Sequence, residues 1–442
     1  MSSLTVVRKL SLAACLLLSL VTAIAKAEPP KILTLRGRTM GTTYMVKVFD
    51  PPAWKADIAA EIDAELRSVN AQMSTYLKSS ELSRFNSWDS TDWFPVSSQT
   101  AEVVEAAIDV SKATEGAFDV TVGPLVNLWS FGPDPKTRAV PDAATIATLR
   151  ESVGYQNLSV RTNPPALKKA TPSLKVDLSS IAKGHGVDRV INVLKDAGAR
   201  NVFVEIGGEV RTIGDKGGVA WKVGIENPAT AGLSNNGLSL AAAHPLTDEA
   251  MATSGDYRIF FEVEGKRYSH TIDPRSGRPI EHDLASVSVI AKTCMKADAW
   301  ATAINVLGAD AGLSAAQSQG LDVLMIRREG RRFSRVGTGS LAKYAVEDPV
   351  SEIEDSALGA QEMRPWLQRL MPTLIVTMIG FGIIISAMAV GVIFGGKSIS
   401  GSCGGLGGKK NEDGSVSCSL CSNPSDACKE LRDKMETETQ NG

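Results

Sequence analysis

The sequence is poor in cysteine and histidine, and it carries almost no net charge. Of its 442 residues, six are cysteine and four are histidine, and the formal net charge is −2. A balance this near neutrality gives no electrostatic sign of a nucleic-acid partner. Cys294 is the one cysteine between residues 28 and 402, so this long part carries no disulfide framework. The chain exceeds one ordinary domain and is long enough to bury a sizeable hydrophobic core.

Long apolar runs are also scarce, and the first lies at the N-terminus. Two basic residues precede an apolar run over 10–24, and "AKA" at 25–27 offers a small-x-small cleavage site. This pattern predicts a signal peptide over 1–27, with an uncleaved anchor as the alternative. Cys15 comes too early in the run for a lipoprotein signal. The domain that follows is expected to face the periplasm.

The second apolar run is long enough to cross a bilayer. Residues 373–394 contain no charged side chain, which predicts a transmembrane helix over 370–395 rather than a buried core helix. An acidic and then amphipathic linker (346–369) precedes it. The tail that follows (396–442) is rich in Gly and Ser and is expected in the cytoplasm. The tail carries four cysteines: Cys403, Cys418, Cys421 and Cys428.

Residues 28–345 mix strand and helix patterns. The predicted strands are 42–49, two strands about a Gly-Gly turn within 201–214, 219–227, and 284–291. The predicted helices are 53–69, 98–113 and 296–308. Strand pairs of this hairpin type predict an α+β domain with a mixed, largely antiparallel sheet and flanking helices. No G-x-G-x-x-G follows a strand and no Walker loop is present, so a bound nucleotide would not be held by either loop.

Two groups of residues could bind a metal and a phosphate. Asp298 and Thr302 are spaced i, i+4 on a predicted helix, and their oxygens are hard ligands of the kind that Mg²⁺ prefers. A helix cap or dipole partner is the structural alternative for the acid. "DLSSIAKGHGVD" (177–188) places Lys183 near a helix start, where backbone N–H groups attract phosphate. A solvated lysine beside a glycine-relaxed turn is the alternative.

Two further segments suit a reaction on a ring-bearing substrate. "SHTIDPRSGRP" (269–279) places His270 at the end of a strand, where it is the best-placed proton acceptor near neutral pH. A structural hydrogen bond near the turn is the alternative. "GAFDVTVGPLVNLWSFGP" (116–133) gathers Gly, Pro, Phe and Trp around Asp119. It forms either a ring-binding wall or a packed loop.

Together these motifs closely resemble the ApbE family, the FAD:protein FMN transferases. They follow the family order from residue 37 to residue 303. The matching stretches are "GRTMGTTY" (37–44), "MSTY" (73–76), "SELSRFN" (80–86), "GAFDVTVGPLVNLWSFGP", "DLSSIAKGHGVD", "GG" (207–208), "TSGDYR" (253–258), "HTIDPRSGRP" and "ADAWATA" (297–303). Each is modest alone, but the set is highly specific.

The resemblance implies an ApbE-type fold and assigns roles to individual residues. The positions that match FAD contacts are Met40, Tyr76, Ala117, Phe118, Asp119, Lys183 and Ile272. The positions that match a Mg²⁺ site are Ser180 (through an oxygen), Asp298 and Thr302. His270 matches the base of the reaction.

The implied function is to cleave FAD and attach FMN through a phosphoester bond to Thr or Ser of acceptor proteins, with release of AMP. Two alternatives stay open at this point. Water in place of the acceptor hydroxyl would make the protein an FAD pyrophosphatase. A non-catalytic assembly factor would hold flavin and metal without needing a base.

The tail resembles a second family, NqrM, a maturation factor for the sodium-pumping NADH:quinone reductase. "SGSCGGLGG" (400–408) and "CSLCSNPSDAC" (418–428) carry this resemblance. It implies that the tail cysteines bind iron, although their spacing alone favours structural zinc. It also implies that subunits of that reductase are the flavin acceptors. The protein is then expected in the inner (cytoplasmic) membrane, with the ApbE-like domain in the periplasm.

Overall fold

The computed structural model describes residues 31–345, except 55, 134–137, 231–238, 258 and 331, and two short strands in the tail. The chain divides into two units, residues 1–353 and 354–442, and each is described by itself. The second unit contributes the antiparallel strands β18 (Lys409–Lys410) and β19 (Val416–Ser417).

Several expected features lie outside the described residues: the signal peptide, the linker, the transmembrane helix and the four tail cysteines. Within the part of the chain that the structure describes, no helix is both long and apolar enough to cross a membrane.

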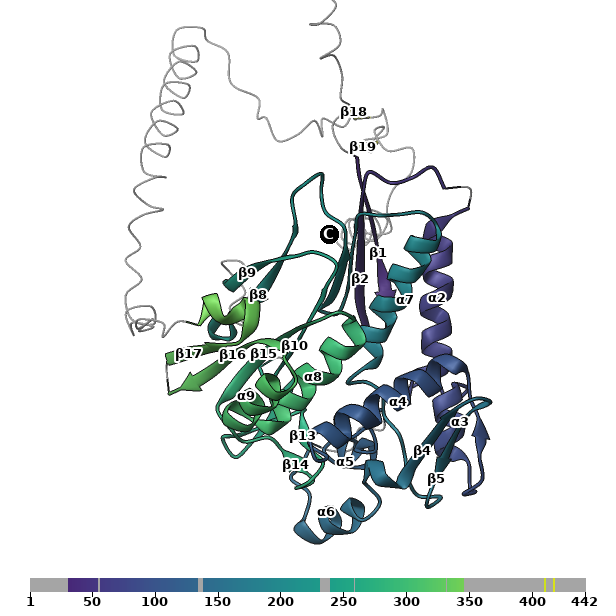
Figure 1. Cartoon of the computed structure of the whole chain (residues 1–442), viewed down its shortest axis with the longest axis vertical. Helices are drawn as coiled ribbons and strands as arrows, with labels where there is room; N and C mark the ends of the chain where they lie inside the picture. Colours follow the sequence, from purple (N-terminus) through teal and green to yellow (C-terminus); the bar gives the residue numbers. More distant parts are fainter. Residues whose placement is uncertain are drawn as a thin grey trace, which may run out of the picture. The chain divides into compact units, whose positions relative to one another are not determined.

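An eight-stranded sheet forms the centre of the first unit, in the order β1-β2-β6-β7-β10-β15-β16-β17 (Figure 1). Its strands are β1 (Ile32–Thr39), β2 (Thr42–Phe49), β6 (Val202–Ile206), β7 (Glu209–Ile213), β10 (Ala250–Gly255), β15 (Leu284–Ala291), β16 (Asp322–Glu329) and β17 (Arg332–Gly337). Every neighbouring pair is antiparallel, as the hairpin patterns predicted.

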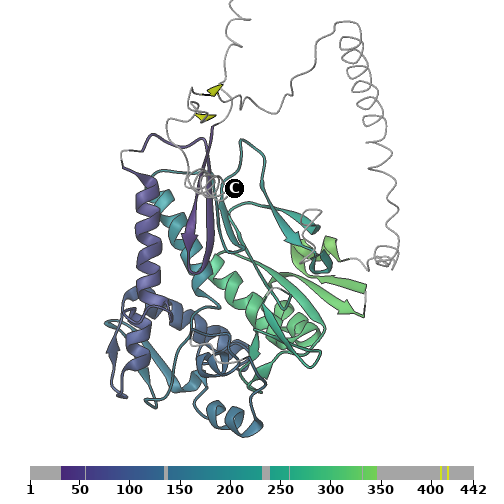
Figure 2. The same cartoon turned by 180° about the vertical axis from the view of Figure 1, so that it is seen from behind.

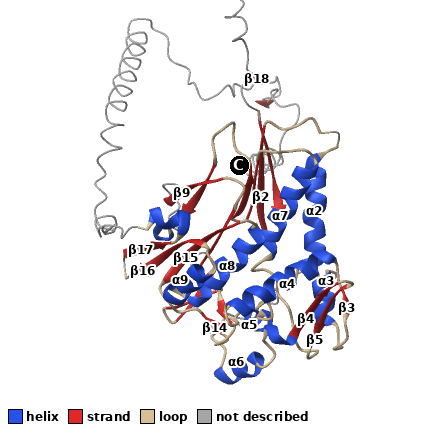
Figure 3. Ribbon diagram, in the orientation of Figure 1, coloured by secondary structure: helices blue, strands red, loops and turns tan. Residues whose placement is uncertain are grey.

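The principal helices are α2 (Ile58–Met73), α4 (Ser98–Ala113), α7 (Ala182–Asp196), α8 (Cys294–Leu307) and α9 (Ala309–Ser318). They gather beside the sheet in Figure 3. Helices α2 and α7 lie side by side in Figure 1 and again from behind in Figure 2.

Alternate residues of each central strand enter different cores, because successive side chains of a strand point to opposite faces. Val202 and Val204 of β6 pack with helices α2 and α7, whereas Phe203 packs on the opposite face. The hairpin of β8 (Trp221–Glu226) and β9 (Leu240–Leu246) covers that second face.

Smaller elements surround this centre. They are the helices α3 (Glu81–Ser87), α5 (Gly123–Leu128) and α6 (Ala143–Arg150), the 3₁₀ turns at Tyr155–Asn157, Pro228–Thr230 and Gly339–Tyr344, the sheet of β3 (Phe94–Pro95), β5 (Pro165–Lys169) and β4 (Leu158–Thr162), and the hairpins β11–β12 (Phe260–Val263, Lys266–Ser269) and β13–β14 (Ile272–Asp273, Arg278–Pro279).

Element boundaries follow the capping residues. The predicted strands 42–49 and 284–291 and the helix 98–113 agree with the structure. The helix predicted over 53–69 instead spans 58–73, because the Asp57 side chain accepts hydrogen bonds from Ala59 N and Ala60 N and so begins it there. Helix α8 begins at 294 rather than 296, because Thr293 caps it through Lys296 N.

Candidate active site

The predicted helix start near Lys183 is confirmed. Helix α7 begins at Ala182, and Ile181 precedes it with no capping side chain. Helix α8 crosses α7 at this end. A Cβ on Gly184 would lie 2.3 Å from the Cys294 carbonyl oxygen, so the close crossing requires glycine here.

Each of the two helices supplies a carboxylate that accepts hydrogen bonds from backbone N–H groups at the start of the other helix. Asp298 of α8 accepts a hydrogen bond from Gly184 N of α7 at 3.0 Å. Asp188 of α7 accepts bonds from Cys294 N and Met295 N of α8, both at 2.9 Å. Such free N–H groups at helix starts favour a negative partner. Each acid therefore acts as an N-terminal partner for the opposite helix.

Lys183, with 31% of its side chain exposed, forms a charge cluster with two buried carboxylates. Its Nζ forms an ion pair with Glu209 Oε1 and lies 3.9 Å from Asp298 Oδ1. Burial alone would lower the pKa of Lys183, but the charges of Asp298 and Glu209 raise it overall. Burial raises the pKa of Asp298, and it raises that of Glu209 to about 7 against the opposing charge of Lys183. When all three are ionised, the cluster carries a net charge of −1.

Glu209 was missed in the sequence. It follows the Gly207-Gly208 turn, which the family resemblance included, but nothing in the local pattern pairs it with a lysine 26 residues away. The local sequence gave one indication of a special role for Glu209: it is an acid that directly follows a glycine pair at the start of a strand.

The polar face of α8 extends from this cluster toward the predicted base. Thr302 Oγ1 lies 3.2 Å from Ser254 Oγ on β10. Asn305, one turn further, is fully buried and its Nδ2 donates to Thr271 Oγ1 at 3.4 Å. Because Thr271 follows His270, one helix face links the charge cluster to the His270 segment.

His270 is oriented to accept a proton. Its Nδ1 lies 3.1 Å from the Ile259 carbonyl oxygen, which also accepts from the His270 backbone N at 3.1 Å. A carbonyl can only accept, so Nδ1 carries the proton and Nε2 of the neutral ring is the free acceptor. Burial, with help from the charge of Lys183, lowers the pKa of His270 and favours that neutral ring. Phe131 packs edge-on at 6.3 Å between ring centroids.

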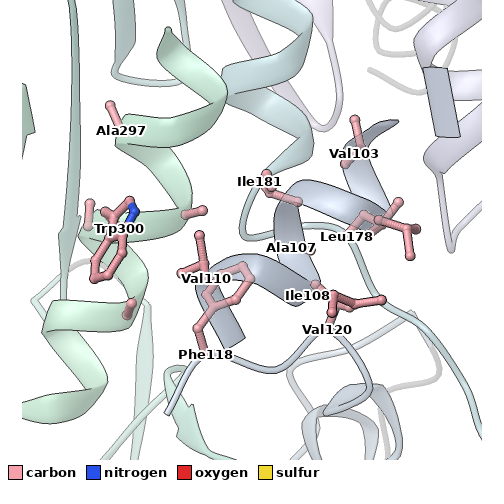
Figure 4. Close-up of a cluster of buried hydrophobic side chains, with 14 of the residues drawn as sticks. Val103, Ala107, Ile108, Val110, Phe118, Val120, Leu178, Ile181, Ala297 and Trp300 are labelled. Atoms are coloured by element: carbon pink, nitrogen blue, oxygen red, sulfur yellow. The ribbon is translucent and has the colours of Figure 1, made fainter. Parts of the chain in front are cut away.

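The side chains of Ala117, Phe118 and Asp119 are buried, so this segment is a packed loop rather than a ring-binding wall made of side chains. Ala117 and Phe118 are buried, and Figure 4 shows Phe118 in one cluster with Val110 and Trp300. Asp119 accepts bonds from Thr121 N, Thr121 Oγ1 and Tyr155 N, at 2.8, 2.7 and 2.7 Å. Burial raises the pKa of Asp119 against these bonds. Any ligand contact of Ala117 and Phe118 therefore falls to backbone atoms.

The remaining predicted residues differ in exposure. Met40 adopts a φ of 48° in the β1–β2 turn, and its Cε lies 2.8 Å from where a Cβ on Gly186 of α7 would be. Ser180 is half-buried in the turn before α7. Ile272 is buried among Leu125, Trp129, Ile146 and Phe261.

Tyr76 is 69% exposed, on the segment that follows α2. Its pKa is raised by partial burial and by the negative charge of Asp177. The structure thus brings Lys183 to Asp298, which shares a face of α8 with Thr302, and Ser180 lies in the turn that leads into α7.

The oxygens at this site fit Mg²⁺. Within the described ranges, no group of three or more His, Cys, Asp or Glu side chains could hold a metal by itself. Asp298 Oδ2 is engaged by Gly184, while Oδ1 faces Lys183 at 3.9 Å. Glu209 Oε2 is buried with no hydrogen-bond partner in the described part of the chain. A site short of protein ligands but rich in hard oxygens suits Mg²⁺, which keeps waters and shares substrate phosphates.

A comparison with protein-family models decides the family. The model described as the ApbE family matches residues 40–325. This chain belongs to the ApbE family. The match spans both helices of the crossing, the Glu209 hairpin and the His270 segment.

Curated ApbE relatives match over nearly their whole length. The FAD:protein FMN transferase of Vibrio cholerae is 44% identical over 320 residues, which cover 72% of this chain and 94% of the relative. That of Haemophilus influenzae is 43% identical over 341 residues, with coverage of 76% and 94%.

Solved ApbE structures share the fold. The flavin transferase ApbE from Vibrio cholerae gives a TM-score of 0.65 at 43% identity and covers 72% of this chain and 100% of its own. The apo form of the Pseudomonas stutzeri flavinyl transferase ApbE gives a TM-score of 0.65 at 37% identity, with coverage of 72% and 98%.

Proposed function

We propose that this ApbE protein is an FAD:protein FMN transferase and that the crossing of α7 and α8 is its active site. The observation that carries the proposal is the cluster at the start of α7, where the Lys183 ammonium contacts Glu209 and lies 3.9 Å from the incompletely bonded carboxylate of Asp298. A helix N-terminus, an ammonium group and hard oxygens are the means by which proteins bind and activate phosphates. Two relatives that are 44% and 43% identical over 320 and 341 aligned residues carry the same activity in their names.

Magnesium fits this site as the resident cation. Asp298, Thr302 and an oxygen of Ser180 would hold it. When bound, Mg²⁺ supplies charge neutralisation for phosphoryl oxygens.

The protein's own groups carry out the remaining parts of the reaction. FAD lies with its pyrophosphate at the start of α7, where the Lys183 ammonium offsets its negative charge. An acceptor Thr or Ser hydroxyl attacks the phosphorus on the riboflavin side, and His270 Nε2 takes the hydroxyl proton. The anhydride P–O bond breaks, AMP leaves, and FMN stays on the acceptor as a phosphoester. Catalysis of this kind rests on positioning and charge neutralisation.

Further residues complete the flavin site in this proposal. FAD contacts come from Met40, Tyr76, Lys183, Ile272 and the backbone of 117–119. The side chains of Phe118 and Ile272 are buried in two different hydrophobic clusters.

A product analysis tests the activity and separates it from its alternatives. The full-length chain in detergent is incubated with FAD, Mg²⁺ and a Thr-containing acceptor, and in-gel flavin fluorescence and AMP are measured. Transfer gives one AMP for each flavinylated acceptor. AMP with free FMN and an unlabelled acceptor indicates an FAD pyrophosphatase. Flavin binding with neither product indicates an assembly factor.

The proposal also covers the membrane topology of the chain, which rests on the sequence alone. The catalytic domain lies in the periplasm, residues 370–395 cross the inner membrane, and the tail faces the cytoplasm. Labelling of Cys418 by a membrane-impermeant thiol reagent in intact spheroplasts would contradict this topology.

The tail cysteines deliver iron to the sodium-pumping NADH:quinone reductase, whose subunits are the flavin acceptors. Thiolates are soft ligands that suit iron or zinc, so metal content must be measured directly. Cys403→Ser is expected to reduce iron loading of the reductase and to leave its covalent FMN intact. Loss of the flavin instead would contradict this division of labour.

A further inference from the structure

Glu209 occupies a position that the proposed reaction does not yet explain. It is the first residue of β7, and its side chain is buried, with 4% of its surface exposed. The turn before it needs two glycines, because Gly207 and Gly208 have φ values of 62° and 108°. This tight turn presents Glu209 to the start of α7.

Lys183 is shared unequally between two acids. Its ammonium is in direct contact with Glu209 Oε1 and lies 3.9 Å from Asp298 Oδ1. Asp298 Oδ2 is held by Gly184 N, so Oδ1 is the oxygen that faces the lysine. Lys183 is 31% exposed, and an ammonium that loses its carboxylate partner is attracted to the nearest remaining negative charge. Without Glu209, that charge is on Asp298.

We propose that Glu209 is a positioning residue that holds the Lys183 ammonium away from Asp298, so that the Asp298 carboxylate stays available to a divalent cation. The proposal rests on the proposed function for the identity of the site. It concerns the competition between an ammonium group and a metal for one carboxylate, which can be measured without FAD or acceptor.

The consequence is a specific coupling between Glu209 and Lys183. With Lys183 present, loss of the Glu209 charge lets the ammonium compete with the cation for Asp298. With Lys183 replaced by an uncharged residue, no competitor is left. With no ammonium to hold, the replacement of Glu209 by Gln then has little effect on Asp298. If Glu209 were instead a ligand of the cation, its loss would weaken binding in either background.

A double-mutant cycle on Mg²⁺ binding tests this coupling. Mg²⁺ alone is titrated by calorimetry into the full-length chain, its Glu209→Gln and Lys183→Met variants and the double variant, in detergent near neutral pH. Mg²⁺ is the probe because it avoids the thiols of the tail. Thermal unfolding of each variant shows that it is folded.

The expected result is at least about tenfold weaker Mg²⁺ binding for Glu209→Gln, which corresponds to about 1.4 kcal/mol. Lys183→Met binds Mg²⁺ at least as tightly as the unmodified chain, and the double variant resembles Lys183→Met. Glu205→Gln is the matched control: it lies on the paired strand β6 beside the same turn and accepts from Gly208 N at 2.7 Å. It is expected to leave Mg²⁺ binding unchanged.

Three outcomes would overturn the proposal: Mg²⁺ binding unaffected by Glu209→Gln, an equal loss in both backgrounds, or no Mg²⁺ binding by the unmodified chain. Because the Lys183→Met variant carries its own expectation, the test does not depend on the stability of the Glu209 variant. Failure of the proposed transferase reaction would appear separately, as missing AMP and missing acceptor fluorescence while the coupling in Mg²⁺ binding persists.

Discussion

Two buried aspartates at the crossing of α7 and α8 occupy matching positions and differ in how fully they are bonded. Asp188 accepts two backbone N–H groups at 2.9 Å and a bond from Arg211 Nη1 at 2.6 Å. Asp298 accepts one backbone N–H at 3.0 Å and has a lysine ammonium 3.9 Å away. Burial raises the pKa of both acids, so the direction of the pKa shift does not distinguish them.

The number of unused lone pairs does distinguish them. Asp188 has its charge paired and both oxygens bonded, which suits a structural link between two helices. Asp298 keeps acceptor capacity on Oδ1, and a buried carboxylate that is not fully bonded is suited to bind a ligand. A sequence motif with an acid near a helix start is therefore ambiguous until the partners of each oxygen are known.

Two histidines, His270 and His185, differ in a similar way in whether the ring can reach a substrate. His270 is half-buried, with Nδ1 bonded to Ile259 and Nε2 free for a substrate proton. His185 is 4% exposed in the first turns of α7, and burial, with the charge of Arg189, lowers its pKa to about 4. Both rings are expected to be neutral at pH 7, but His270 alone of the two is placed to act on an acceptor.

The largest effect is expected from Asp298→Asn. The amide oxygen can still accept from Gly184 N, so the fold should be kept while the charge for the cation is lost. Several kcal/mol of transition-state stabilisation correspond to about 10³-fold or more in kcat. The rate of acceptor flavinylation at saturating FAD measures it. Near-normal transfer at limiting Mg²⁺ would remove Asp298 from the mechanism.

His270→Ala is expected to lower kcat by about 10²–10⁴-fold, the usual contribution of a general base, while FAD affinity changes little. The pKa of His270 is lowered, so the active neutral ring should persist as pH falls below 6.5, the ordinary value for histidine. The acidic limb of the kcat profile should accordingly lie below that pH. A large loss of FAD affinity with an unchanged saturated rate would make His270 a binding residue.

Asp188→Asn is expected to act on stability. It leaves Arg211 without its buried partner and weakens the bonds to Cys294 N and Met295 N, at a cost of about 3 kcal/mol in the free energy of unfolding. Chemical denaturation measures the loss, and the activity per folded molecule should stay close to that of the unmodified chain. If instead Asp188→Asn reduces kcat as strongly as Asp298→Asn, the assignment of a structural role to Asp188 and a cation-binding role to Asp298 is wrong.

At neutral pH the smallest effect is expected from His185, because its contribution to stability changes only at acidic pH. The unfolded chain takes up a proton on this ring near pH 6.5, whereas the folded chain does so near pH 4. Between these values the unfolded state binds more protons, so the free energy of unfolding falls as pH falls, by up to about 3 kcal/mol. Denaturation from pH 7 to pH 4 should show a shallower decline for His185→Gln. Parallel curves for the two proteins would mean that His185 titrates alike in both states.

Local patterns determined much of the fold and part of the site. The strands 42–49 and 284–291 and the helix 98–113 were predictable because side-chain period and capping act over a few residues. The spacing of Asp298 and Thr302 put both on one helix face for the same reason. The order of motifs along the chain was sufficient to indicate the family.

Tertiary structure decided which of these residues meet. Gly184 and Asp298 are 114 positions apart, and Cys294 and Asp188 are 106 apart. No local pattern encodes such contacts, which arise when two helices pack together on one sheet. For this reason Glu209 was missed, and the buried position of Phe118 did not follow from its motif. The sequence could name the acids and the lysine, but only packing at the α7–α8 crossing left one carboxylate saturated and the other open.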